Sequence, residues 1–132
     1  MRGEKYQGKI CEIHPDVAGL RFKSSYICVP CTTERSRAWR AANPRQNRNT
    51  MLLRKYGITY DQFTLLLEVQ GGKCAICRGT EIGGSGDWHV DHNHMTGKVR
   101  GILCSPCNVG LGHFKDDPVL IETAAAYLRR HK

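Results

Sequence analysis

Four side chains that bind metals or transfer protons lie within the six-residue stretch HVDHNH, residues 89–94. They are His89, Asp91, His92 and His94. Groups packed this tightly repel or desolvate one another unless they bind something. The stretch is therefore a metal site, a catalytic site, or a polar hairpin that is merely rich in histidine, and the rest of the chain must distinguish these three.

Seven cysteines determine where zinc would bind. Their odd number, in a chain whose N-terminus lacks an apolar signal segment, argues against a disulfide framework and predicts a cytoplasmic protein. Two C-x2-C knuckles each place two sulfurs on one side of a tight turn, and four thiolates form the usual tetrahedral shell of structural Zn²⁺. The first predicted zinc site is Cys74, Cys77, Cys104 and Cys107.

The remaining three cysteines need a fourth ligand. Cys28 and Cys31 form a third knuckle, and Cys11 precedes His14 at the same spacing. These four residues would form a second zinc site; the alternative is that Cys11 is an ordinary buried thiol and His14 a surface residue. Two structural zinc ions account for every cysteine. Three knuckles also argue against a redox-active thiol protein, which needs one reactive pair.

A hairpin and a helix would position the histidine cluster. Between the two later knuckles, residues 88–94 and 98–103 read as strands around a turn at Thr96-Gly97, and a helix opens at Cys104. Zinc would clamp the outer ends of this hairpin. Because sulfur already fills the zinc shell, the histidines belong to a second site between hairpin and helix.

An Asp beside a His, facing an Asn from a helix, can form a site that hydrolyses phosphodiesters. Asp91 and Asn108 offer hard oxygen ligands to Mg²⁺, and His92 can deprotonate an attacking water. Neighbours on a regular strand point to opposite faces, so Asp91 and His92 share one site only if the strand ends or bulges there. For His89, solvent exposure without any role is an equal alternative.

The positive charge is concentrated in one half of the chain. Residues 1–57 hold 12 Lys/Arg against 4 Asp/Glu, whereas residues 58–132 hold 8 of each. This asymmetry predicts a polyanion-binding segment, and residues 32–57 read as a basic helix that is broken or kinked at Pro44. No apolar run is long enough to cross a membrane. The residues predicted to contact DNA are Arg35, Arg37, Arg40, Arg45, Arg48 and, on the second strand, Arg100.

The second half of the chain resembles the HNH, or ββα-metal, nuclease superfamily, and within it the recombination endonuclease VII family of phage. The resemblance rests on four segments from residue 74 onward: CAIC, DHNH, GKVRGIL and CSPCN. The resemblance implies a nuclease that cuts one DNA strand per active site, as a dimer, and in some members at branched junctions. It implies structural zinc on the four later cysteines and a catalytic Mg²⁺ or Mn²⁺ on Asp91 and Asn108. His92 would be the general base, and His94 would assist at the phosphate.

The chain departs from the family pattern in two places. Leu111 stands three residues after Asn108, where the junction-resolving prototype has an acid, and His113 is the candidate accessory group to replace it. The prototype's long C-terminal dimerisation region is expected to be absent, and a basic zinc module precedes the nuclease motif instead. Whether the protein forms a homodimer and whether it cleaves junctions therefore stay open.

The sequence thus predicts a small, zinc-stabilised α+β protein. Residues 1–57 would form a zinc ribbon-like module with a basic DNA-binding helix, and residues 58–132 a ββα-metal nuclease domain. The predicted function is a metal-dependent DNA endonuclease in the cytoplasm of a bacterial cell or phage-infected host. The alternative is a non-catalytic, zinc-dependent DNA-binding protein; Asp91 argues against it, because a carboxylate repels DNA unless a cation neutralises it.

Overall fold

The protein, described by a computed structural model over residues 3–84 and 86–131, divides into two compact units, Met1–Arg48 and Asn49–Lys132. The described residues form five α-helices, one short 3-10 helix and two two-stranded antiparallel sheets. The predicted α+β class is confirmed. The predicted functional division at residues 57/58 stays a prediction.

The first unit begins with a short hairpin. Strand β1 (Lys5–Gln7) pairs antiparallel with β2 (Leu20–Phe22), and the 3-10 helix η1 (Pro15–Val17) lies in the connection. Gly19 has φ +76° and faces the carbonyl oxygen of Gly8 so closely that no Cβ would fit. Among the described residues of this unit, Cys28 is the one hydrophobic side chain that is buried, so the unit has almost no apolar core.

Two consecutive helices carry the basic segment. Helix α1 (Val29–Ala42) begins inside the third knuckle, with Pro30 in its first turn, three residues earlier than expected. Proline suits this position because the first N–H groups of a helix have no partner within the helix. Asn43 ends α1, since its backbone N–H and its Nδ2 both donate to the carbonyl of Trp39 at 2.9 and 2.8 Å. Pro44 then starts α2 (Pro44–Tyr56), which confirms the predicted break.

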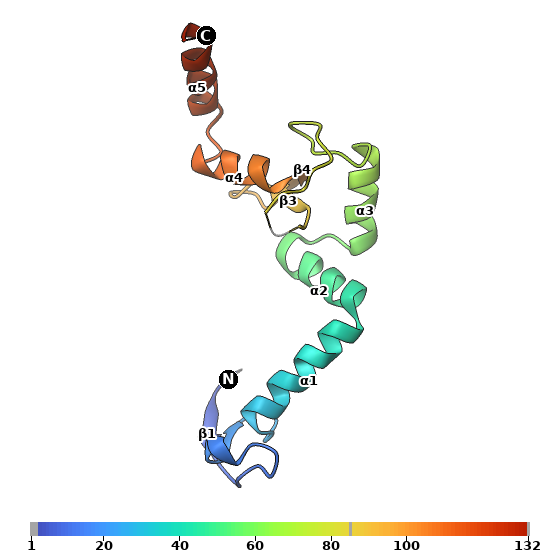
Figure 1. Cartoon of the computed structure of the whole chain (residues 1–132), viewed down its shortest axis with the longest axis vertical. Helices are drawn as coiled ribbons and strands as arrows, with labels where there is room; N and C mark the ends of the chain where they lie inside the picture. The colour runs from blue at the N-terminus through green and yellow to red at the C-terminus, as the bar shows by residue number, and fades with distance from the viewer. Residues whose placement is uncertain (1–2, 85, 132) are drawn as a thin grey trace. The chain divides into compact units, whose positions relative to one another are not determined.

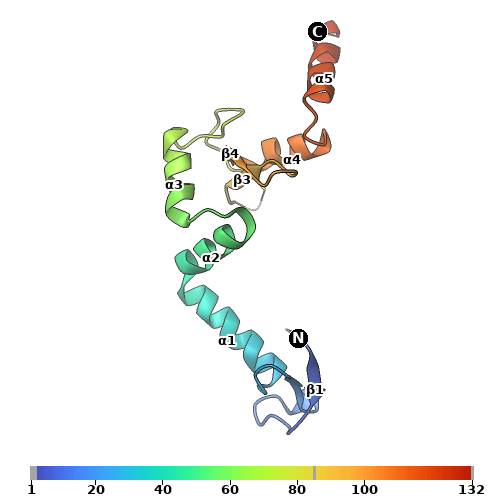
Figure 2. The same ribbon diagram turned by 180° about the vertical axis from the view of Figure 1, so that it is seen from behind.

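The second unit has a small apolar core. Helix α3 (Tyr60–Val69) starts with a capping box, in which Gln62 N–H donates to Thr59 Oγ1 at 3.1 Å and Thr59 N–H donates to Gln62 Oε1 at 2.7 Å. The helix contributes Phe63 to a buried core, and the views from both sides show α3 next to the hairpin (Figures 1 and 2). The buried members of this core are Leu52, Phe63, Val90 and Ile102.

Strands β3 (His89–His92) and β4 (Val99–Leu103) form the predicted hairpin, with Val90 opposite Ile102 and Asp91 opposite Gly101. Both strands are shorter than predicted because Asn93 begins the turn. Its Oδ1 accepts hydrogen bonds from the backbone of Met95 at 2.8 Å and Thr96 at 2.9 Å. The side chain of Asn93 thereby fixes the turn between β3 and β4.

Gln70 closes the outer edge of the hairpin. At the C-terminal end of α3, its Nε2 donates to the carbonyl of Ile102 at 2.9 Å, and its Oε1 accepts from the N–H of Ile102 at 2.9 Å. The amide therefore pairs with β4 as a neighbouring strand would. A Cβ at Gly101 would lie 3.1 Å from the same oxygen, which explains a glycine in the middle of a strand.

Helix α4 (Ser105–His113) begins inside the Cys104–Cys107 knuckle and packs against β3 (Figure 1, orange), completing a ββα unit. Helix α5 (Pro118–Arg130) starts at an N-cap, Asp117, whose Oδ1 accepts a hydrogen bond from the N–H of Val119 at 2.8 Å. None of the described helices is long and apolar enough to span a membrane.

Candidate active site and metal clusters

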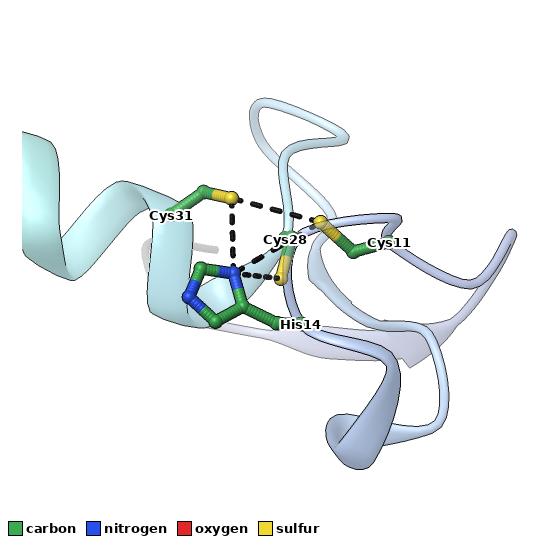
Figure 3. Close-up of side chains that lie close together, drawn as sticks. All are labelled: Cys11, His14, Cys28 and Cys31. Atoms are coloured by element: carbon green, nitrogen blue, oxygen red, sulfur yellow. Dashed lines mark hydrogen bonds between the residues drawn. The ribbon is translucent and has the colours of Figure 1, made fainter.

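The first unit brings Cys11, His14, Cys28 and Cys31 together into what we call the N-terminal cluster (Figure 3). Their donor atoms all lie within 4.8 Å of one another, with Cys31 Sγ 3.2 Å from His14 Nδ1 and 3.6 Å from Cys11 Sγ. Cys28 and Cys31 meet the other two because α1 starts within their knuckle. Three thiols and one imidazole at this spacing match the donors and the number of ligands that Zn²⁺ takes.

Glu34 completes the N-terminal cluster from outside. Its Oε1 lies 2.9 Å from His14 Nε2, on the opposite side of the ring from the sulfurs. This hydrogen bond raises the pKa of His14 and holds its Nδ1 toward the cysteines. A carboxylate behind a histidine is the usual arrangement for orienting a metal ligand.

The second unit brings Cys74, Cys77, Cys104 and Cys107 together into the C-terminal cluster, again with all donor atoms within 4.8 Å. This cluster lies against apolar side chains: Cys74, Leu103 and Cys104 are buried, and Leu111 packs beside them. Because Cys104 follows β4 directly and also caps α4, the cluster joins the hairpin to the helix.

The thiols of the C-terminal cluster differ in acidity. Burial raises the pKa of Cys74, but hydrogen bonds from the backbone of Cys104 and Cys77 outweigh it and lower the pKa to about 6. Burial raises the pKa of Cys107 to about 12, with the neighbouring sulfurs adding to the effect. One thiolate therefore forms readily while the next resists ionisation, and a divalent cation among the four sulfurs would remove that conflict. The donor set fits Zn²⁺.

The hairpin brings Asp91 and His92 to one end of β3. The pairing register shifts between these two residues: Asp91 lies opposite Gly101, whereas His92 lies opposite Val99, and β3 ends at His92. The strict alternation of side chains therefore fails at this step. Two neighbouring residues of one strand can serve a single site only with such an irregularity.

Two aromatic rings hold His92. The ring of His94 stacks on it with centroids 4.8 Å apart and planes 15° apart, and the ring of Tyr56 meets it edge-on at 5.2 Å. His92 is half-buried, while the side chain of His94 is 74 % exposed. The two predicted histidines thus lie in direct contact.

Arg100 holds the carboxylate of Asp91. Its Nε and one terminal nitrogen donate to the two oxygens of Asp91, both at 2.7 Å, and the same terminal nitrogen lies 3.3 Å from Asp116. These interactions, the Asp91 hydrogen bonds foremost, raise the pKa of Arg100. Only 12 % of the Asp91 side chain is exposed, so its orientation is set by this bidentate pair.

Asp116 joins the same network, and the sequence alone does not predict this contact. Its Oδ2 lies 3.6 Å from His94 Nε2, and with Arg100, His94 and Lys115 it lines a pocket of about 410 Å³ beside the hairpin. Lys115 and Asp116 both adopt φ +56°, which is uncommon outside glycine. This left-handed step after α4 places Asp116 against the hairpin. One sequence signal could have pointed to Asp116. Two aspartates precede Pro118, and capping α5 needs only Asp117, so Asp116 is left for another role.

The other predicted residues are spread over α4 and the hairpin. Asn108 is half-buried on α4, which packs on β3, and among the described residues its side chain makes no hydrogen bond to Asp91 or His92. Leu111 packs against the C-terminal cluster, and His113 is exposed at the end of α4. His89 is not simply solvent-facing: within the described part of the chain its buried Nε2 has no hydrogen-bond partner.

The predicted DNA-contacting arginines fall into two groups. Arg100 is engaged with Asp91 and Asp116, as described above, and its contact with DNA stays a prediction. The others belong to the first unit, where all but the half-buried Arg48 are exposed: Arg35, Arg37, Arg40, Arg45 and Arg48.

Comparisons with known proteins identify relatives of this chain. Residues 49–130 match the model of the family described as recombination endonuclease VII. The Gene 59 proteins of Mycobacterium phages D29 and L5 are each 39% identical, over 112 and 110 residues; these stretches cover 84% and 83% of this chain and 67% and 66% of the phage proteins. The chain thus spans about two thirds of the length of these relatives.

A solved structure was also found, that of the ββα-Me type II restriction endonuclease Hpy99I, at 34% identity and a TM-score of 0.43. The match covers 56% of this chain and 43% of that enzyme. The family model itself covers most of the chain, including the whole hairpin and α4. The chain therefore belongs to the recombination endonuclease VII family, which places it among the nucleases that act on DNA.

Proposed function

We propose that this protein is a metal-dependent DNA endonuclease that hydrolyses phosphodiester bonds at the end of β3. In this proposal, Asp91 and Asn108 bind one catalytic Mg²⁺ or Mn²⁺, His92 is the general base, and His94 assists at the phosphate. Zinc ions in the N-terminal and C-terminal clusters would be structural. His113 stays an accessory candidate, and Asp116 joins the site through Arg100 and His94.

The reaction follows from the groups present. His92 accepts a proton from water, the water oxygen attacks phosphorus, and the bond to the 3′ oxygen breaks; the departing 3′ oxygen takes a proton from solvent and becomes a hydroxyl. The divalent ion, when bound, would neutralise the charge that develops on the phosphate and on the leaving oxygen. Asp91 is fixed by Arg100, and His92 is fixed by the rings of Tyr56 and His94. Fixing base and ligand before the substrate arrives lowers the cost of reaching the transition state.

One observation carries the proposal: the register shift between Asp91 and His92 at the end of β3. In a regular strand the two side chains would lie on opposite faces, and a metal ligand could not act beside its adjacent base. The irregular step removes this obstacle. The half-buried carboxylate of Asp91 also suits a cation ligand better than a group that touches DNA directly.

The alternative function is a zinc-dependent DNA-binding protein without catalysis. The basic surface of α1 and α2 would serve either function, so it does not distinguish them. The register shift that lets Asp91 and His92 serve one site favours the enzyme. The ion pair between Arg100 and Asp91 does not distinguish the two functions, because it neutralises the carboxylate in either case. DNA is the partner in both cases. A homodimer and a place in the cytoplasm of a phage-infected bacterial cell are further parts of the proposal, the latter supported by the phage relatives.

A nicking experiment tests the proposal. Zinc-loaded protein is incubated with supercoiled plasmid, linear duplex and a four-way junction, each with Mg²⁺, Mn²⁺ or neither ion. We expect cleavage of at least one substrate with Mg²⁺ or Mn²⁺, and none without them. Absence of cleavage on all three substrates with both ions would leave the binding protein as the better account.

A further inference from the structure

A second pocket lies in the first unit, where α1 gives way to α2. It has a volume of about 430 Å³, and none of the side chains that line it is acidic. Trp39 is 45 % exposed there. Arg40 is anchored along α1 by a 3.1 Å hydrogen bond from its Nε to the carbonyl of Ser36. The lining residues are Arg35, Ser36, Trp39, Arg40 and Asn47.

The charge around this pocket has one sign. Residues 32–57 contain seven Lys/Arg and one acid, Glu34. That carboxylate is already engaged with His14 at the N-terminal cluster. Nothing acidic in the pocket lining thus offsets Arg35 and Arg40, and the complementary ligand is an anion.

An exposed indole beside arginines suits a particular anion. Indole presents an apolar face on which a nucleobase can stack, while guanidinium groups bind the phosphates on either side of that base. Duplex DNA offers its grooves only the edges of bases, because each face is covered by the next base pair. A base can therefore reach the face of Trp39 only when it is unpaired and unstacked.

We propose that the Trp39 pocket binds an unpaired nucleobase together with its flanking phosphates, so that the first unit prefers single-stranded segments of DNA. The proposal rests on DNA being the partner under the proposed function, but not on catalysis. Asn47, contributed by α2, adds an amide that can hydrogen-bond to the edge of the stacked base.

Binding measurements without Mg²⁺ or Mn²⁺ test this pocket independently of cleavage. The probes are a fluorescein-labelled oligothymidylate of about 12 nucleotides and a duplex of the same length, and the protein is the full, zinc-loaded chain. Trp39→Ala should lower the affinity for the single strand about tenfold or more. The affinity for the duplex should change by less than about twofold. Trp39→Phe should keep most of the single-strand affinity, because a flat ring remains.

Arg37→Ala is the matched control, since Arg37 is on α1 but does not line the pocket. Arg37→Ala should lower the affinity for the single strand and for the duplex by the same factor, as the loss of a phosphate contact does. Zinc content and circular dichroism of each variant report folding. Unchanged single-strand affinity in a folded Trp39→Ala protein, or equal losses on the two probes, would overturn the proposal. Unchanged affinity would indicate another occupant, such as an acidic peptide.

Discussion

The two cysteine clusters have the same number of ligands but very different surroundings. The C-terminal cluster lies against buried Leu103, and the same unit holds a separate core built around Ile102. The N-terminal cluster lies in a unit where, of the described hydrophobic residues, only Cys28 is buried. Zinc in the C-terminal cluster would thus add to an existing apolar core, whereas zinc in the N-terminal cluster would take the place of a core.

This difference matches the work that each unit is proposed to do. Catalysis needs groups held in fixed geometry, and the second unit holds Asp91 and His92 by packing, ring contacts and a bidentate ion pair. Binding an extended polyanion needs mainly exposed positive charge, which short helices on a metal-stabilised base can present. Mutations in the two units should therefore have different consequences.

Removal of one ligand from each cluster should have the largest effect. Cys31→Ser should lower zinc content from two ions to one and unfold the β1–β2 hairpin, because structural zinc contributes about 10 kcal/mol or more in zinc-dependent modules of this kind. Cys107→Ser should also cost one zinc, yet the Ile102 core should keep measurable hydrogen-exchange protection. Each variant is the control for the other. If the amides of β1 and β2 stay protected from hydrogen exchange in Cys31→Ser, the first unit does not depend on a metal for its fold.

Glu34→Gln tests the group behind the N-terminal cluster. Loss of the carboxylate that orients His14 should lower the zinc affinity of this site about 10- to 100-fold, measured by competition with a chromogenic chelator. The second zinc should be unaffected. Glu68→Gln, an exposed change on α3, is the matched control. Equal zinc affinities in the two variants would show that Glu34 has no such role.

Asp116→Asn should have a smaller effect, confined to catalysis. Arg100 would lose one of its two acidic partners, Asp91 would be held less firmly, and kcat should fall about tenfold while KM for DNA changes little. Asp116→Glu should restore part of the rate. Glu122→Gln on α5 is the control. A wild-type kcat in Asp116→Asn would remove this residue from the site.

Features that depend on neighbouring residues were predictable from the sequence. The knuckles, the Thr59 capping box, the Asp117 cap and the hairpin turn each need only a few consecutive residues, and each is present in the structure. Among contacts between distant residues, the two cysteine clusters were predictable, because a shared metal requires the knuckles to meet. The other contacts between distant residues were not. The pairing of Glu34 with His14 and the clamp of Gln70 on β4 join segments that no periodic pattern connects.

Arg100 illustrates the same limit within the candidate site. Its sequence context, a basic strand in a basic protein, indicated a phosphate contact, and only the fold shows that it faces Asp91 across the hairpin. The need for an irregular strand at Asp91-His92 could be stated in advance. Its location, at the last residue of β3, follows from the turn that Asn93 begins.

The most direct test of the account is His92→Ala in a plasmid-nicking assay with Mg²⁺ or Mn²⁺. We expect loss of nicking by at least a hundredfold, the lower end of what general-base catalysis usually contributes, with zinc content and DNA affinity unchanged. His131→Ala, an exposed histidine at the end of α5, should nick at the wild-type rate. Nicking by His92→Ala at the wild-type rate would contradict the assignment of the general base and, with it, the proposed site.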